Sequence, residues 1–230
     1  MKVVALVPAA GSGERLGRAS EEKPFLEIGG KPLLAHVLSR LSDSGRIDRI
    51  VVMVKDKYLE RTRDLIRGWH IEKVQSVVPG GVTRTESVRN GIEEASPGED
   101  ELVLIHDGAR PFVTGEVIER AVDLAARTGA AVVGLPCDST IKKVSGDLTV
   151  EETPPRSGLW EAQTPQVFSS EVIREAYRAY AGGNVTDDSS LVEMSGRKVK
   201  MVKGTRDNIK ITVPEDIRLA EAILAGERAE

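Results

Sequence analysis

Short apolar runs alternate with amphipathic stretches along the first 135 residues, and this rhythm limits the possible folds more than any other feature of the chain. Five runs have the length and composition of buried strands: 3–7, 50–54, 74–78, 102–105 and 130–135. The stretches between them read as helices: 33–41, 57–67, 83–95 and 115–127. The third of these opens with a capping box at Thr83–Glu86. This repeated β-α pattern predicts an α/β fold, a Rossmann-like and mostly parallel sheet with helices on both faces.

The rhythm breaks after Pro136, where two alternating segments meet at a Gly146-Asp147 turn with no helix between them. We interpret residues 140–150 as a β-hairpin and residues 138–158 as an arm that stands off the sheet. Further along we expect helices near 171–180 and 187–194 and a strand at 198–202, and then a last helix opened by a capping box at Thr212–Glu215. Residues 1–230 are predicted to form a single domain that carries this arm.

Composition narrows the class of protein. A chain of 230 residues with 40% hydrophobic and 30% charged content can bury one large core. A net charge of −4 argues against a nucleic-acid surface, and no window approaches the roughly 20 apolar residues of a membrane span. The first apolar run is too short for a signal peptide, so we expect a cytoplasmic protein. The single cysteine, Cys137, is expected to be a small packed hydrophobe.

A glycine-rich loop follows the first apolar run, and it holds Gly11, Gly13 and Gly17. Its G-x-G-x-x-x-G spacing differs from the dinucleotide fingerprint, and no Lys-Ser or Lys-Thr follows it as in a P-loop. Small residues would let backbone N–H groups approach an anion, and the cations Arg15 and Lys23 suit a triphosphate. The alternative interpretation is a surface turn with solvated charges.

Other polar motifs also stand where predicted strands end, which is where ligands bind in open α/β sheets. Pro79-Gly80-Gly81 follows the third run, His106–Pro111 follows the fourth, and Pro136 ends the fifth. Asp107 follows the four apolar residues of the fourth run with only His106 between, so it could hold Mg²⁺ that bridges phosphate oxygens. It could instead cap a turn. His106 is expected to be structural.

Taken in order, these motifs closely resemble those of the 2-C-methyl-D-erythritol 4-phosphate cytidylyltransferase family: Pro8-Ala9-Ala10-Gly11-x-Gly13-x-Arg15, Lys23, Gly80-Gly81 with Arg84-x-x-Ser87-Val88, His106-Asp107-Gly108-Ala109-Arg110-Pro111, Leu159-Trp160-Glu161-Ala162-Gln163-Thr164-Pro165-Gln166 and Asn208-Ile209-Lys210. The resemblance implies transfer of CMP from CTP to a polyol phosphate in the non-mevalonate isoprenoid pathway, with release of pyrophosphate and a need for Mg²⁺ or another divalent cation. It also implies a homodimer joined through the arm. Val82 departs from a polar or acidic residue that some relatives carry beside the glycine pair.

The same resemblance implies roles for individual residues. Four are expected to be catalytic: Arg15 and Lys23, which would stabilise the transition state, and Arg156 and Lys210, which would orient the polyol phosphate. The expected CTP contacts are Pro8, Ala9, Ala10, Gly11, Gly13, Gly81, Ser87, Asp107 and Ala109. The expected polyol-phosphate contacts are Asp107, Arg110, Thr140, Arg156, Thr164 and Lys210. Asp107 is the expected metal ligand, with Asp207 a weaker second.

The expected reaction explains why the motifs include no Ser-His-Asp or Cys-His set. A phosphate monoester loses its second proton near pH 6, so at neutral pH the attacking oxygen is already ionised and needs no general base. Catalysis would then depend on positioned cations that stabilise the negative charge developing on the α-phosphate and on pyrophosphate. Two other functions stay open, namely a ribitol 5-phosphate cytidylyltransferase with the same cations and a non-catalytic nucleotide-sensing module. The joint presence of Arg15, Lys23, Asp107 and Lys210 disfavours the second.

Overall fold

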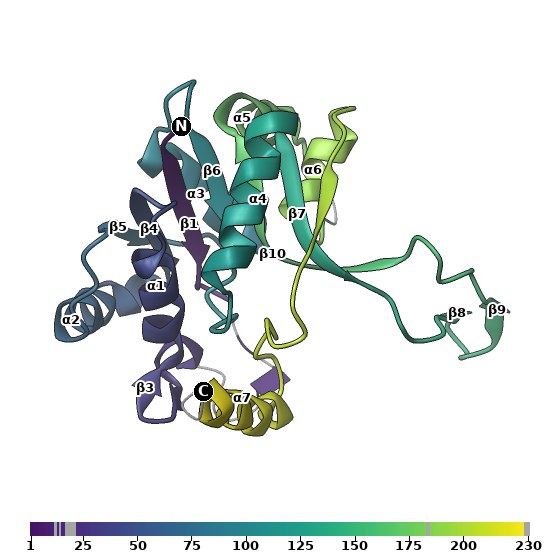
Figure 1. Cartoon of the computed structure of the whole chain (residues 1–230), viewed down its shortest axis with the longest axis horizontal. Helices are drawn as coiled ribbons and strands as arrows, with labels where there is room; N and C mark the ends of the chain where they lie inside the picture. The colour runs from purple at the N-terminus through teal and green to yellow at the C-terminus, as the bar shows by residue number, and fades with distance from the viewer. Residues whose placement is uncertain (12, 14, 17–21, 183–184, 228–230) are drawn as a thin grey trace.

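The computed structural model describes residues 1–11, 13, 15–16, 22–182 and 185–227 (Figure 1). A mixed seven-stranded sheet forms its centre, in the order β11-β7-β10-β6-β1-β4-β5. The strands are β1 Val3–Pro8, β4 Arg49–Val54, β5 Val74–Pro79, β6 Leu102–Ile105, β7 Ala130–Pro136, β10 Trp160–Ser169 and β11 Lys200–Lys203. The paired strands run parallel except at β10, which is antiparallel to both neighbours. The predicted Rossmann-like α/β class is therefore confirmed.

Helices cover both faces of the sheet. One face packs against α1 Leu33–Asp43, α2 Leu59–Gly68 and α4 Gly115–Thr128, and the other against α3 Arg84–Ala95, α5 Ser170–Ala179 and α6 Asp188–Met194. Successive β1 side chains point to opposite faces, so Val3 and Ala5 join the first core cluster and Val4 joins the second. This two-sided burial explains why the strands read as continuous apolar runs. Among the described residues, no helix is long and apolar enough to cross a membrane.

Strand β10 was not predicted from the sequence. It inserts between β6 and β7, although it carries Gln163, Thr164 and Gln166, each less than a tenth exposed. These polar side chains interrupt the apolar pattern of a buried strand. In the structure they find partners from distant segments, among them Asn208 and Asp187. A polar strand can lie in the core only because those partners satisfy it.

The predicted capping box at the last helix is wrong. Helix α7 runs over Pro214–Glu227, one residue later than a Thr212 cap requires. The backbone N–H groups of Thr212 and Val213 both donate to the Asp216 carboxylate, at 2.6 and 3.0 Å. The Thr212 hydroxyl instead donates to the carbonyl of Lys210 at 2.9 Å, so it fixes the segment that enters the helix.

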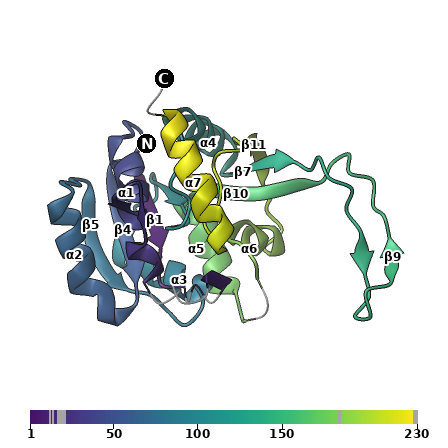
Figure 2. The same cartoon turned by 90° about the horizontal axis from the view of Figure 1, so that it is seen from below.

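Two hairpins leave the main sheet. Strands β8 Lys143–Val144 and β9 Val150–Glu152 pair at the end of an arm that projects from the body, as Figures 1 and 2 show. The predicted hairpin is confirmed, with strands shorter than expected. Strands β2 Glu27–Ile28 and β3 Lys31–Pro32 form the second hairpin, and α7 packs against β2. The 3-10 helix η2 Lys23–Phe25 comes just before β2.

Candidate active site

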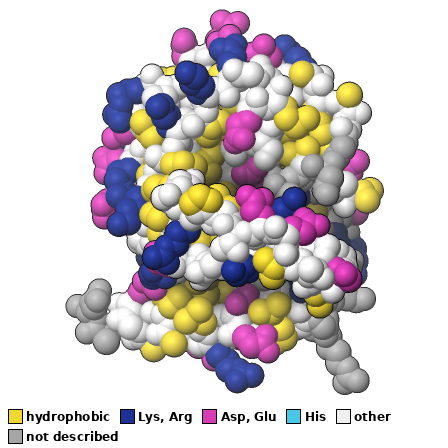
Figure 3. Space-filling view, turned by 90° about the vertical axis from the view of Figure 1, so that its right-hand side faces the viewer, with side chains coloured by type: hydrophobic (Ala, Val, Ile, Leu, Met, Phe, Trp, Pro, Cys, Tyr) yellow, Lys and Arg dark blue, Asp and Glu magenta, His cyan; other side chains and the backbone are white. Residues whose placement is uncertain are grey.

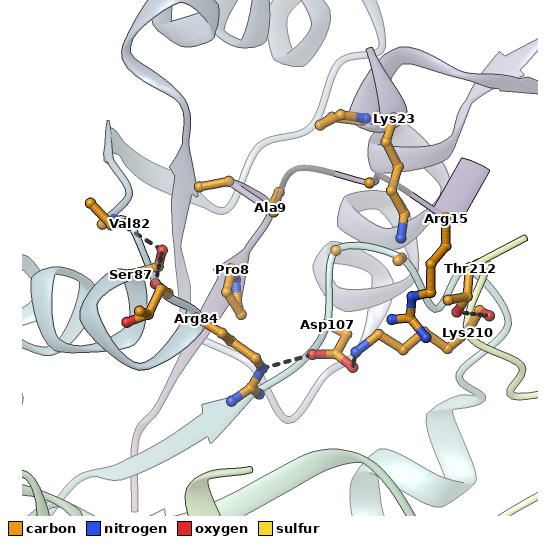
Figure 4. A pocket seen from close by; sticks show the side chains of 18 residues that line it. Pro8, Ala9, Arg15, Lys23, Val82, Arg84, Ser87, Asp107, Lys210 and Thr212 are labelled. Atoms are coloured by element: carbon orange, nitrogen blue, oxygen red, sulfur yellow. Dashed lines mark hydrogen bonds and ion pairs between the residues drawn. The ribbon is translucent and has the colours of Figure 1, made fainter. Parts of the chain in front are cut away.

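A cavity of about 440 Å³ opens beyond the carboxyl ends of β1, β5 and β6 (Figure 4). Every residue predicted to contact CTP lines it, and so do Arg15, Lys23 and Lys210. Three of the four predicted strand-end motifs therefore meet in one place. Pro136, at the end of β7, does not join them, because it lines a separate cavity of about 380 Å³ near the base of the arm.

Backbone hydrogen bonds continue the sheet into the loops of this cavity. The N–H of Ala9 donates to the carbonyl of Met53 at 2.7 Å, and that of Gly80 to Val54 at 2.7 Å. The N–H of Gly108 donates to the carbonyl of Pro8 at 3.1 Å. A Cβ at Gly108 would lie 2.8 Å from the Cβ of Ala9 and 3.2 Å from the carbonyl oxygen of Pro8, so the two loops can approach this closely only with glycine here. Ser12, Glu14 and Gly17 of the glycine-rich motif lie outside the described residues.

The second glycine loop is tied to helix α3. Thr83 caps α3 and forms the predicted capping box with Glu86. Ser87, one turn into the helix, accepts a hydrogen bond from the N–H of Gly81 at 3.0 Å and donates to the carbonyl of Thr83 at 2.9 Å. The Ser87 hydroxyl therefore fixes the shape of the loop that edges the cavity.

The Asp107 carboxylate is the group around which charged side chains gather in the cavity. Its carboxylate lies 2.8 Å from the Lys210 amine, 3.2 Å from Nε of Arg84 and 3.5 Å from Nε of Arg110. Burial alone would raise the pKa of Asp107, but Arg84, Lys210 and Arg110 outweigh it and hold that pKa well below the usual range. Asp107 is therefore ionised at neutral pH, and it gathers three cations around one carboxylate.

A chain of hydrogen bonds holds Asp107 from behind. Its N–H donates to Oγ1 of Thr164 at 3.0 Å, and that hydroxyl lies 3.1 Å from Nδ1 of His106. Nε2 of His106 lies 3.0 Å from the carbonyl of Arg110. Burial lowers the pKa of His106 to about 4, so the ring is neutral at pH 7 and connects these groups structurally, as expected from the sequence.

Lys23 reaches into the cavity from η2 (Figure 4). Burial first, then the charge of Lys210, lowers its pKa to about 8. The anchor of η2 is Phe25, whose ring meets Tyr58 edge to face at 5.2 Å and lies 4.0 Å below the Arg61 guanidinium. These contacts hold a lysine whose charge is only partly compensated, which is a common property of active-site groups.

Arg84 is a cavity residue to which sequence reasoning gave no role. It occupies the first position of α3, and its guanidinium bridges Asp107 and the buried Asp188, 2.7 Å from the latter. The sequence pointed to it only as a cation directly after the Thr83 cap and as a member of the motif Arg84-x-x-Ser87-Val88. Its partner Asp188 stands far along the chain, so nothing local indicated the bridge.

Four of the predicted polyol contacts do not line the cavity. Arg110 and Thr164 lie behind Asp107, where the Thr164 hydroxyl is used within the protein. Thr140 and Arg156 are exposed on the arm, and Nη1 of Arg156 donates to the carbonyl of Asp138 at 2.6 Å. Their roles stay predictions, and those of the arm residues need a second chain.

Asp107 is the one carboxylate among the described residues that line the cavity. No group of three or more histidine, cysteine, aspartate or glutamate side chains in the described part of the chain could hold a metal ion, and Asp207 is exposed outside the cavity. Mg²⁺ at nucleotide sites keeps water and phosphate ligands and takes only one or two carboxylates. A cavity with a single ionised carboxylate fits an ion of that kind.

Comparisons with known proteins agree with this geometry. The family model described as 2-C-methyl-D-erythritol 4-phosphate cytidylyltransferase matches residues 3–226. An enzyme of that name from Geobacillus kaustophilus is 45% identical over 232 residues and covers 100% of both chains. One from Halalkalibacterium halodurans is 43% identical and covers 98% of each.

Solved structures show the same similarity. The 4-diphosphocytidyl-2C-methyl-D-erythritol synthase of Anaerococcus prevotii superposes with a TM-score of 0.85 at 32% identity, over 97% of this chain and 96% of that one. The 2-C-methyl-D-erythritol 4-phosphate cytidylyltransferase of Thermus thermophilus superposes with a TM-score of 0.78 at 34% identity, over 98% and 100%.

Proposed function

The chain belongs to the 2-C-methyl-D-erythritol 4-phosphate cytidylyltransferase family, and we propose from this how its cavity performs the family's reaction. The enzyme transfers CMP from CTP to 2-C-methyl-D-erythritol 4-phosphate in the non-mevalonate isoprenoid pathway. The products are 4-diphosphocytidyl-2-C-methyl-D-erythritol and pyrophosphate. The observation that carries our account is a cavity in which four cationic side chains, those of Arg15, Lys23, Arg84 and Lys210, surround one carboxylate.

The reaction needs charge compensation more than proton transfer. The phosphate of the polyol attacks the α-phosphorus of CTP as an ionised monoester, so an oxygen–phosphorus bond forms while the bond to pyrophosphate breaks. Negative charge grows on the α-phosphate and on the departing pyrophosphate. Arg15 and Lys23 stabilise that charge, while Lys210 holds the incoming phosphate beside Asp107.

The nucleotide lies along the loops after β1 and β5 in this account. The backbone at Ala9, Ala10 and Gly81 borders the base, and Ser87 keeps that edge in shape. The N–H groups of Gly11 and Gly13 approach the phosphates. Small residues leave a space that suits a pyrimidine. Asp107 would hold Mg²⁺ together with phosphate oxygens and water, and the ion would neutralise charge on the triphosphate.

The rest of the polyol site comes from a second copy of the chain in our proposal. The arm exposes apolar side chains, with Leu148 80%, Val150 53% and Val144 45% exposed. Figure 3 views the molecule from the side of the arm, where hydrophobic and charged side chains are interspersed. A homodimer that buries these residues would bring Thr140 and Arg156 of one chain to the cavity of the other. The single-domain assignment with an arm at 138–158 and the cytoplasmic location stay predictions.

One assay tests the substrate. The enzyme is incubated with CTP, Mg²⁺ and either 2-C-methyl-D-erythritol 4-phosphate or ribitol 5-phosphate, and pyrophosphate is measured. We expect release with the first polyol phosphate. Release only with ribitol 5-phosphate would favour the alternative polyol, and no release with either, together with tight CTP binding, would favour a nucleotide-sensing module. Omission of the divalent cation tests the metal requirement in the same assay.

A further inference from the structure

A buried acidic residue lies beneath the active site without reaching it. Asp188, in the first turn of α6, is 1% exposed and does not line the cavity. Its Oδ2 lies 2.7 Å from Nη2 of Arg84, while Nε of the same guanidinium faces Oδ1 of Asp107 at 3.2 Å. Arg84 therefore joins one carboxylate inside the cavity to another that substrate does not touch, and Figure 4 shows the cavity end of this bridge.

Asp188 is itself held from two further directions. The hydroxyl of Tyr177 on α5 donates to its Oδ1 at 2.6 Å. Burial and the carboxylate raise the pKa of Tyr177, so the hydroxyl keeps its proton. The backbone N–H of Asp188 donates to Oε1 of Gln166 at 3.1 Å, and Gln166 belongs to the central strand β10. Tyr177 thus holds the Asp188 carboxylate and Gln166 holds its backbone, and together they fix where Asp188 meets Arg84.

We propose that Asp188 is a positioning residue for cytidylyl transfer, which acts by holding Arg84 between two carboxylates so that Asp107 stays available to Lys210. The inference rests on the proposed function. It adds a part of the machinery on α5 and α6, elements that contribute no residue to the cavity lining.

Asp188 matters in this way because Arg84 and Lys210 compete for the Asp107 carboxylate. Arg84 and Lys210 both approach this carboxylate, and the Lys210 side chain is 39% exposed whereas that of Arg84 is 27% exposed. While Asp188 takes Nη2, Arg84 offers Asp107 only Nε. Without Asp188, the guanidinium would be free to turn both N–H groups onto Asp107, the bidentate geometry that arginine prefers. Lys210 would then lose its place beside Asp107 and meet the incoming phosphate from another position.

The experiment compares two neighbouring substitutions. Asp188→Asn removes the charge that holds Arg84. Asp187→Asn makes the same chemical change one residue earlier, at the cap of α6, where it disturbs the hydrogen bond from Nε2 of Gln166 but does not contact Arg84. We expect Asp188→Asn to lower kcat/KM for the polyol phosphate about tenfold to a hundredfold, as small displacements of positioned groups do. Asp187→Asn should lower the melting temperature but leave kcat/KM of the folded enzyme close to wild type.

A double-mutant cycle separates positioning from fold stability. If Asp188 acts through Arg84, adding Asp188→Asn to an Arg84→Gln enzyme lowers kcat/KM no further. The double variant also leaves no unpaired buried charge, so it should fold at least as well as Asp188→Asn alone. Should Asp188→Asn alone not fold, Tyr177→Phe loosens Asp188 more mildly and takes its place in both backgrounds.

Each outcome decides a different question. A loss of kcat/KM that is large in the wild-type background and absent in the Arg84→Gln background supports the inference. An equal loss in both backgrounds, or equal effects of the substitutions at 187 and 188, would overturn it. Failure of the wild-type enzyme to release pyrophosphate would overturn the proposed function instead, so the two failures are distinguishable.

Discussion

At the scale of single residues, the cavity collects cations that differ in how firmly they are held. Arg84 and Lys210 contact the Asp107 carboxylate, at 3.2 and 2.8 Å. Lys23 belongs to the same cluster, and burial together with neighbouring cations makes its charge costly. The free-energy cost of keeping such a cation charged is offset most when negative charge develops beside it. Lys23 should therefore matter most in the transition state, and Arg15, which lines the same cavity, is expected to act with it.

We expect Lys23→Ala and Arg15→Ala each to lower kcat about a hundredfold or more, with a smaller change in affinity for CTP, since one preorganised donor is typically worth this much. Steady-state kinetics and calorimetric CTP titration measure the two effects. Lys57→Ala, which removes an exposed lysine outside the cavity, is the control. A near-normal kcat with only a raised KM would show that these cations bind the ground state.

The pKa of Lys23 gives a dependence on pH. Its value of about 8 in the folded enzyme means that the free enzyme loses this cation as the pH rises through 8. We therefore expect kcat/KM for CTP to fall on the alkaline side with an apparent pKa near 8, and Lys23→Arg to remove that limb, because arginine keeps its charge. A wild-type profile that stays flat to pH 10 would contradict the assignment.

Stability should change with the opposite sign over the same range. The folded pKa lies below the ordinary value of 10.5, so between about pH 8 and 10.5 the unfolded chain binds more protons at Lys23 than the folded one. The destabilisation from burying this charge is complete below pH 8 and is relieved above it. The melting temperature of the wild type should therefore rise, relative to that of Lys23→Met, as the pH is raised through this window.

At the scale of elements, the sequence predicted what depends on local pattern. The strands with both faces buried carry continuous apolar runs, so β1, β4 and β6 could be predicted from sequence alone. The Thr83 capping box was predicted for the same local reason. The polar strand β10 and the bridge from Arg84 to Asp188 were not predicted, because their partners are brought together only by the complete fold.

In the proposed binding mode, the base preference is a property of two loops rather than of one side chain. All nucleoside triphosphates share the phosphates, so in that mode selectivity for CTP arises where the loops after β1 and β5 border the base. Sites that hydrogen-bond one base edge reject mismatched bases strongly, so we expect kcat/KM for UTP and ATP to lie at least about 10²-fold below that for CTP. Parallel pyrophosphate assays with the three nucleotides test this. Equal values for CTP and ATP would exclude a pyrimidine-shaped pocket.

At the scale of the whole molecule, the proposed dimer through the arm would make each active site belong to two chains. Arg156 stands on the arm and outside the cavity of its own chain, whereas Lys23 lines that cavity. Mixing Lys23→Ala chains with Arg156→Ala chains tests the shared site. In a heterodimer one site would carry both defects and the other neither, so random exchange should restore about a quarter of wild-type activity.

Mass spectrometry of the intact dimers provides the control for this mixing experiment. If heterodimers form and no activity returns, Arg156 acts within its own chain. If no dimer of any kind forms at working concentration, the role assigned to the arm is wrong.

The backbone bonds that join Ala9, Gly80 and Gly108 to neighbouring strands have a consequence for how the enzyme meets its nucleotide. Because these bonds extend the ladder of the sheet, their amide protons should exchange with deuterated solvent only when the core strands open. If CTP binds as proposed, it meets a backbone edge that folding has already ordered, and little conformational entropy is lost along that edge on binding. Folding alone therefore sets the shape of this side of the pocket.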